Sequence, residues 1–173
     1  MSWESVPRSK VSRTRIWERS NSLQALARCG PKAVGLYQYW NARRGIRSMP
    51  GRGDIDPLEM RQWLPRITLV DVDGEDRFTY RLVGTQIVDL LGINPTGQPI
   101  ESAWPEEMTA PMLQGLRQVV ETRAPVFALQ TCQWRGDQQP TAWFMRLPLS
   151  SDGAEVEMVL AYLSDNIGML SQL

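Results

Sequence analysis

The chain has 173 residues, of which 42% are hydrophobic, enough for one domain with a substantial core and too few for two domains of usual size. It contains no histidine, which excludes a Ser-His or Cys-His nucleophile pair, a histidine general base and histidine-ligated zinc or haem. The net charge is zero, but residues 1–66, the basic leader, carry 13 Lys+Arg against 5 Asp+Glu, and residues 67–173, the acidic body, carry 6 against 14. We expect the basic leader to pack on the acidic body or, alternatively, to hold an anion.

The first 63 residues predict a basic arm followed by helices. Residues 1–21 mix arginine with serine and few apolar groups, which indicates a flexible arm. Residues 22–63 are interpreted as an N-terminal helical extension. Within it, Leu36, Tyr37 and Trp40 recur on one face of a helix that begins at Pro31 and stops at Gly45. This stripe needs a cover, and we expect it to form a dimer interface.

A second, short helix is predicted just before the sequence changes its period. Asp56 supplies an N-cap and Pro57 suits the first helical position, while Pro65 ends the segment. Beyond Pro65 the apolar residues alternate as in strands. Residues 64–165 are therefore assigned to one domain and residues 166–173 to a C-terminal tail.

The sequence pattern of residues 64–165 predicts strands and helices in the following order. Two strands flank the Asp73-Gly74 turn, a short helix ends at Gly92, an irregular stretch follows, and an apolar face predicts a helix from Pro111. Three more strands follow, at 125–134, 141–150 and 155–165, with turn signals at 135–140 and 150–153. This order predicts an α+β fold, a five-stranded antiparallel sheet with helices on one face, preceded by the N-terminal helices.

Several short motifs resemble a known family. They are Tyr39-Trp40, Arg44-Gly45, Asp54-Ile55-Asp56-Pro57, Leu64-Pro65, Tyr80-Arg81-Leu82-Val83-Gly84-Thr85, Gly92 and Thr96-Gly97. Together, over roughly residues 36 to 165, they resemble a family of small proteobacterial proteins with a PAS-like domain. The resemblance implies a PAS fold, used as a sensor or protein-interaction module with no family-wide enzymatic activity or ligand, with a pocket between sheet and helices and a preceding helix that often takes part in dimerisation.

Cofactors and catalysis are not expected. The Asn-Cys-Arg-Phe-Leu-Gln run of flavin photosensors is missing, which argues against flavin photochemistry, and the missing histidine argues against the commonest haem ligand, with Cys or Met ligation left open. Cys29 and Cys132 have no metal-type spacing and are interpreted as free thiols. No pair of carboxylates is fixed on one helix face in an apolar stretch, so we predict no catalytic residues, no metal site and no enzyme.

Large residues of the helices and the last three strands are candidates for lining the pocket. They are Trp104, Met112, Leu116, Phe127, Leu129, Trp143, Met145, Met158, Leu160 and Tyr162. Because successive residues of a strand face opposite sides, only part of this set can point inward. Arg81 or Arg146 would be the charged group that orients a ligand. A filled core built from the same side chains is the alternative.

Arginines near the end of the first helix are candidates for an anion site. Arg43, Arg44, Arg47 and Arg52 cluster near glycines and could hold phosphate through bidentate bonds. A solvated charged face is the alternative. Nucleic acid is not expected as a partner, because the body of the chain is acidic.

The sequence thus predicts a non-enzymatic sensory or signalling module that acts through protein contacts. We expect a homodimer, an unidentified signalling protein as partner, and a small apolar or amphipathic ligand in the pocket. A metabolite sensor with an anion site in the arginine-rich segment is the alternative, and a carboxylate-based hydrolase or isomerase is a third. Neither an apolar run long enough to span a membrane nor a signal peptide is present, so we expect no membrane contact and a cytoplasmic location.

Overall fold

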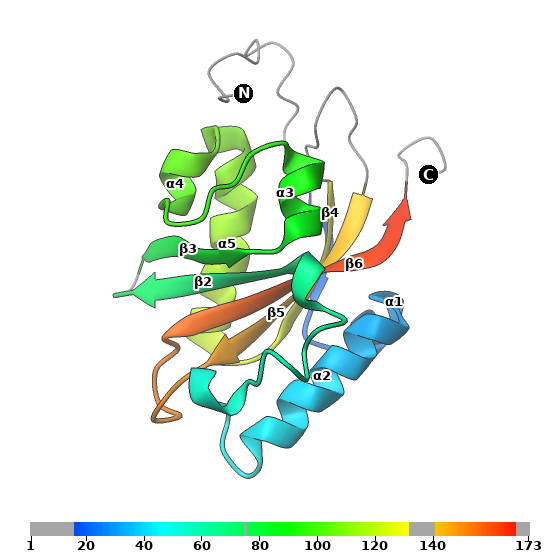
Figure 1. Cartoon of the computed structure of the whole chain (residues 1–173), viewed down its shortest axis with the longest axis vertical. Coiled ribbons are helices and arrows are strands. Elements are labelled where there is room, and N and C mark those ends of the chain that lie inside the picture. The colour runs from blue at the N-terminus through cyan, green and yellow to red at the C-terminus, as the bar shows by residue number, and fades with distance from the viewer. Residues whose placement is uncertain (1–15, 75, 132–140, 169–173) are drawn as a thin grey trace.

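The computed structural model describes residues 16–74, 76–131 and 141–168. The described residues form an α+β fold around a six-stranded sheet, in which every neighbouring pair of strands is antiparallel and the order is β1-β4-β5-β6-β2-β3. Figure 1 shows the arrangement. The strands are β1 (Ile16–Ser20), β2 (Ile67–Asp73), β3 (Arg77–Val83), β4 (Val126–Thr131), β5 (Thr141–Leu149) and β6 (Met158–Gly168). The helices are α1 (Leu23–Arg28), α2 (Pro31–Arg44), α3 (Thr85–Leu91), α4 (Ile100–Ala103) and α5 (Glu106–Thr122), with 3-10 turns η3 (Arg52–Asp54) and η4 (Leu64–Arg66).

Glycine and proline set several boundaries as the sequence predicts. Helix α2 begins at Pro31 and ends before Gly45, whose φ of 58° lies in the left-handed region. Helix α3 ends at Gly92, which has a φ of 77°. Strands β2 and β3 form the expected hairpin around the Asp73-Gly74 turn. The α+β class and the sequence of five predicted strands are confirmed.

Several local expectations differ from the structure, among them the stretch predicted as irregular after Gly92, which contains the short helix α4. The sheet has a sixth strand, because the end of the segment predicted as a flexible arm forms β1, which pairs with β4. The first 15 residues of that arm, Cys132 and the predicted turn at 135–140 lie outside the described residues. Helix α5 begins at Glu106 and carries Pro111 inside it, since Met108 extends the apolar face one turn earlier. The segment after Asp56 forms turns that lead into η4, rather than a regular helix.

The helices cover both faces of the sheet. Helices α3, α4 and α5 lie on one face, as expected, whereas α2 lies against the other (Figure 1). The Tyr37 ring contacts the Phe127 ring of β4 at a centroid distance of 6.2 Å, and the Trp40 indole Nε1 donates to the Pro148 carbonyl oxygen at 2.9 Å. The extension and the domain therefore share one hydrophobic core.

This packing corrects the predicted dimer interface. Leu36 is 0% exposed and Trp40 is 2% exposed within the single chain, and Tyr37 packs against that same core. The aromatic stripe is thus covered by the chain's own sheet, which removes the reason to assign it to a second copy.

The basic leader and the acidic body meet at the end of β6. The Asp165 carboxylate receives Lys32 Nζ at 2.7 Å and Arg66 Nε at 2.8 Å. These two ion pairs connect residues before and after position 67 within one chain. No helix in the described parts of the chain combines the length and the apolar character needed to cross a membrane.

Candidate ligand-binding site

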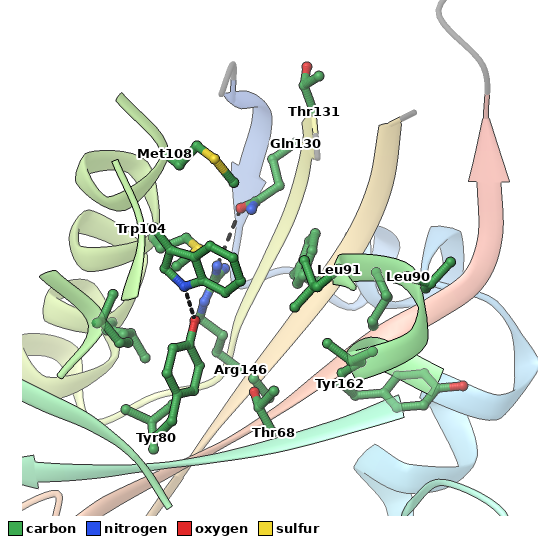
Figure 2. A pocket seen from close by; sticks show the side chains of 18 residues that line it. Thr68, Tyr80, Leu90, Leu91, Trp104, Met108, Gln130, Thr131, Arg146 and Tyr162 are labelled. Atoms are coloured by element: carbon green, nitrogen blue, oxygen red, sulfur yellow. Dashed lines mark hydrogen bonds between the residues drawn. The ribbon is translucent and has the colours of Figure 1, made fainter. Parts of the chain in front are cut away.

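A cavity of about 110 Å³ lies between the inner face of the sheet and helices α3, α4 and α5. It is partly open to solvent, and its surface is mostly apolar. One water needs roughly 10–15 Å³ measured in the same way, so the space exceeds what a single trapped water would fill. Figure 2 shows the side chains that line it. The alternative of a completely filled core therefore does not hold on this face.

Two helices supply the apolar walls. Ile87, Leu90 and Leu91 project from α3, and residues of α5 with a spacing of four face them from another side, namely Met108, Met112 and Leu116. Residues three and four positions apart lie on one side of a helix, which is why each helix presents a continuous apolar strip to the cavity. Unbranched methionine side chains adapt to ligands of different shape.

One end of the cavity is polar. Tyr80, on β3, accepts a hydrogen bond through its hydroxyl oxygen from Trp104 Nε1 at 3.0 Å, and the two rings meet edge to face with centroids 6.5 Å apart. Burial raises the pKa of Tyr80 to about 12, although the Trp104 hydrogen bond and the nearby Arg146 charge both act in the opposite direction. The Tyr80 hydroxyl is therefore protonated at neutral pH.

Arg146 is a buried charge at this polar end. It is 4% exposed, and its Nη2 donates to the Gln130 Oε1 of β4 at 3.3 Å. Its guanidinium carbon also lies 5.5 Å from the centroid of the Phe144 ring. Ala161 is its register partner on β6, and this small side chain leaves room above the strand. Figure 2 shows Tyr80, Trp104, Gln130 and Arg146 gathered on one side of the cavity.

Gly115 provides the space that the guanidinium occupies. A Cβ added at Gly115 of α5 would lie 3.0 Å from Arg146 Cζ and 3.1 Å from its Nη1. Such contacts are shorter than ordinary van der Waals distances, so any larger residue would press on the guanidinium. A glycine inside a helix costs about 0.5–1 kcal/mol relative to alanine. Here its role is to admit a charged side chain between helix and sheet.

The predicted pocket residues divide between the two faces of the sheet. Trp104, Met112 and Leu116 lie on the cavity wall, as does Arg146, and Tyr162 borders it with its ring directed away from the polar end (Figure 2). The remaining predicted residues, which do not line the cavity, are Phe127, Leu129, Trp143, Met145, Met158 and Leu160. Assigning these six to the pocket was wrong.

Strand register explains this division. Phe127 is opposite Met145 and Leu129 is opposite Trp143, so these pairs share the face that α2 covers, next to Tyr37. Inward-facing positions alternate with these along each strand. The sequence shows the alternation, but it does not show which of the two sets of alternate residues faces which helix.

Arg81 is not part of the cavity. Its Nη1 lies 3.1 Å from Asp71 Oδ2, and its side chain is 61% exposed. The choice between Arg81 and Arg146 as the charged group at the cavity is thus decided in favour of Arg146.

The arginine cluster near the end of α2 makes local contacts. Arg43 pairs with Glu59, and Arg47 pairs with Asp54 at 2.8 Å while donating to the Arg43 carbonyl oxygen at 2.9 Å. Arg44 donates to Asn41 Oδ1 at 2.7 Å and to the Arg47 carbonyl oxygen at 2.9 Å, and Arg52 donates to the Ile55 carbonyl oxygen at 3.0 Å. Basic side chains that cap the last carbonyls of a helix stabilise that end. These contacts favour a structural role over an anion site.

Several lining residues were absent from the sequence prediction. They are Thr68, Val70, Tyr80, Ile87, Leu90, Leu91, Ile100, Met108, Gln130, Thr131, Phe144, Ala161 and Leu163. Gln130 carried a usable signal, because a glutamine inside the apolar run Val-Phe-Ala-Leu-Gln-Thr must find a partner if the strand is buried. Tyr80 lies two residues after Phe78, so both point to the buried side of β3, and this spacing could have identified it.

The site contains the parts of a binding pocket. An apolar cavity with a few convergent polar groups is the usual form of a small-molecule site. Within the described ranges, no group of three or more His, Cys, Asp or Glu side chains is placed to hold a metal ion.

The chain matches a known protein family. A family model described as a PAS domain matches residues 30–164. That range starts just before α2 and ends in β6, so it includes the helix that covers the second face of the sheet. Neither the curated proteins nor the solved structures returned a match.

Proposed function

Because this chain belongs to the PAS domain family, whose members serve as sensory and signalling modules, we propose that it is a non-enzymatic sensor that binds a small, mainly apolar molecule between its sheet and helices α3 to α5. The observation that carries the proposal is the cavity of about 110 Å³, with apolar walls and one polar end. Sites of this composition bind ligands by burying apolar surface and orient them with a few polar contacts.

A chain of hydrogen bonds from the cavity wall to β6, the last strand in the sequence, supports a signalling role. Arg66 Nε donates to Gln86 Oε1 of α3 at 2.8 Å, and Arg66 Nη1 donates to the carbonyl oxygens of Leu163 and Ser164 on β6 at 3.3 and 2.8 Å. Helix α3 forms one wall of the cavity. A ligand that shifts α3 would therefore disturb bonds that hold the last strand, and we propose that a partner protein, or a second copy of the chain, responds to that change.

Native mass spectrometry tests the sensor proposal. Protein purified from its own host should retain a small molecule in a ratio of one per chain. Leu91→Trp should fill the cavity and lower the bound fraction at least tenfold, whereas Leu58→Trp, at a side chain that is 67% exposed, should leave it unchanged. Protein that carries no small molecule under any growth condition, and that binds no small apolar probe, would contradict the proposal.

A further inference from the structure

The polar end of the cavity presents hydrogen-bond donors from three strands. Arg146 comes from β5, Gln130 from β4 and Tyr80 from β3 (Figure 2). A guanidinium carries five N–H donors and no acceptor, so Arg146 can contact a ligand while it keeps its bond to Gln130. Tyr80 accepts its hydrogen bond from Trp104 through oxygen, which leaves its own O–H to donate.

The charge of this end favours an acceptor with negative charge. Among the described residues that line the cavity, Arg146 is the charged one, and the others are neutral. Arg146 is a buried residue, so its guanidinium acts through a medium less polarisable than water, and its attraction for an anion is stronger than at the surface. Burial keeps Tyr80 protonated and therefore able to donate. A ligand ammonium group at the same place would be repelled.

We propose that the ligand of this cavity is a small organic acid with an apolar body. Its carboxylate would lie against the Arg146 guanidinium and the Tyr80 hydroxyl, because a planar guanidinium matches a carboxylate with two parallel hydrogen bonds. Its hydrocarbon part would lie between Leu91 on α3 and Met112 on α5. This inference rests on the proposed sensor function and adds the chemical class of the ligand.

Gly115 is a positioning residue for this carboxylate. It does not reach the polar end itself, but an added Cβ would meet Arg146 Cζ at 3.0 Å. A side chain at this position would displace the guanidinium from its place beside Gln130 without altering the net charge. The preference for an acid should therefore depend on Gly115 as well as on Arg146.

Three ligands that share the same hydrocarbon chain and differ only in the head group separate the contribution of the head group to binding from that of the apolar body. Hexanoate, hexan-1-ol and hexan-1-amine are titrated into the purified full-length chain by isothermal calorimetry at pH 7. Hexanoate should bind roughly 10- to 100-fold more tightly than hexan-1-ol, the range expected for a hydrogen bond to a charged group. Hexan-1-amine should bind more weakly than hexan-1-ol, because its ammonium group carries the same sign of charge as the Arg146 guanidinium.

Substitution of the arginine tests the assignment directly. Arg146→Met keeps a long apolar side chain and should reduce the ratio of hexanoate to hexan-1-ol affinity to about one, while hexan-1-ol still binds. Arg81→Met is the matched control, since Arg81 is an exposed arginine on the edge strand β3 of the same sheet, and it should keep the wild-type ratio. Circular dichroism of each variant checks that the fold is retained.

A second pair of variants serves if Arg146→Met does not fold. Gly115→Ala should lower the hexanoate to hexan-1-ol ratio at least threefold. Gly35→Ala is its control, because Gly35 also lies inside a helix and an added Cβ there would meet Trp63 at an ordinary 3.5 Å. The control should keep the wild-type ratio.

The outcomes distinguish the inference from the function on which it rests. Equal binding of hexanoate and hexan-1-ol, or a preference for hexanoate that survives both Arg146→Met and Gly115→Ala, would overturn the organic-acid assignment and leave an apolar sensor standing. Failure of all three probes to bind would count against the sensor function itself, and the assignment would fall with it.

Discussion

Gly84 joins β3 to α3 at a point where two parts of the backbone approach closely. Its φ of −63° and ψ of 149° suit any residue, so conformational freedom does not explain the glycine. A Cβ at this position would instead lie 2.4 Å from the carbonyl oxygens of both Leu64 and Pro65. Its N–H also donates to the Ile67 carbonyl oxygen at 2.7 Å. We expect Gly84→Ala to be strongly destabilising.

The magnitude follows from the distances. Carbon and oxygen that are not covalently linked normally stay about 3.3–3.6 Å apart, so η4 and the start of α3 would have to separate by about 1 Å. Overpacking of this kind costs about 1–3 kcal/mol, and weakening the Gly84 hydrogen bond adds about 0.5–1.5 kcal/mol. The sum, about 1.5–4.5 kcal/mol, is a large part of the usual stability of a domain.

Urea denaturation followed by tryptophan fluorescence measures this change in unfolding free energy. Gly53→Ala is the control, because an added Cβ there has no neighbour within 4 Å, and its stability should stay within about 0.5 kcal/mol of wild type. Helix α3 forms a cavity wall, so Gly84→Ala should also weaken binding of an apolar probe. A Gly84→Ala protein as stable as the Gly53→Ala protein would refute the steric reasoning.

Three further changes test the packing and the charges. Trp40→Phe should lower the unfolding free energy by about 1–3 kcal/mol, because the buried Pro148 carbonyl loses its donor; an effect on dimer dissociation alone, seen by analytical ultracentrifugation, would contradict this. Asp165→Asn should cost about 1 kcal/mol in thermal denaturation at low salt, and 1 M NaCl should reduce this difference without removing it, because Lys32 is exposed whereas the Arg66 side chain is only 19% exposed. Burial raises the pKa of Tyr80 and of Tyr162 to about 12, whereas unfolded tyrosine titrates near 10, so stability should be complete below about pH 10 and be lost as the pH rises towards 12. The phenolate absorbance of Tyr80 and Tyr162 should therefore appear together with unfolding, and Tyr80→Phe should make the loss less steep. Ionisation of all the tyrosines near pH 10 in folded protein would contradict the assignment.

The two arginines illustrate how far the sequence leads to the site. Arg81 and Arg146 both stand in alternating strands, and either satisfies the expectation of one charged group at a pocket. Arg146 is buried because β5 is central in the sheet and α5 leaves space above it at Gly115. Arg81 is exposed because it points to the opposite side of the edge strand β3 from the buried Tyr80. Strand order and the helix that faces each strand depend on residues far apart in the chain, which local patterns do not contain.

The motif that carries the family resemblance shows the same limit. Tyr80 to Thr85 can be recognised in the sequence, but the reason for two of its residues becomes visible only in the fold. Tyr80 forms the polar end of the cavity with Trp104, and Gly84 makes room for the backbone of η4. Both reasons involve segments at least 18 residues away from them in the chain.

Local chemistry in the sequence determined the order of strands β2 to β6, the ends of α2 and α3 at glycines, the β2–β3 hairpin, the absence of histidine chemistry and the α+β class. These features depend on the conformational preferences and the apolar spacing of neighbouring residues. Tertiary structure decided that β1 joins the sheet, that the Trp40 stripe is covered by the chain's own second face, and that Arg146 and not Arg81 borders the cavity. The physical reason is that a strand has two chemically similar faces, and only its pairing with distant strands and helices fixes which of them is buried against which partner.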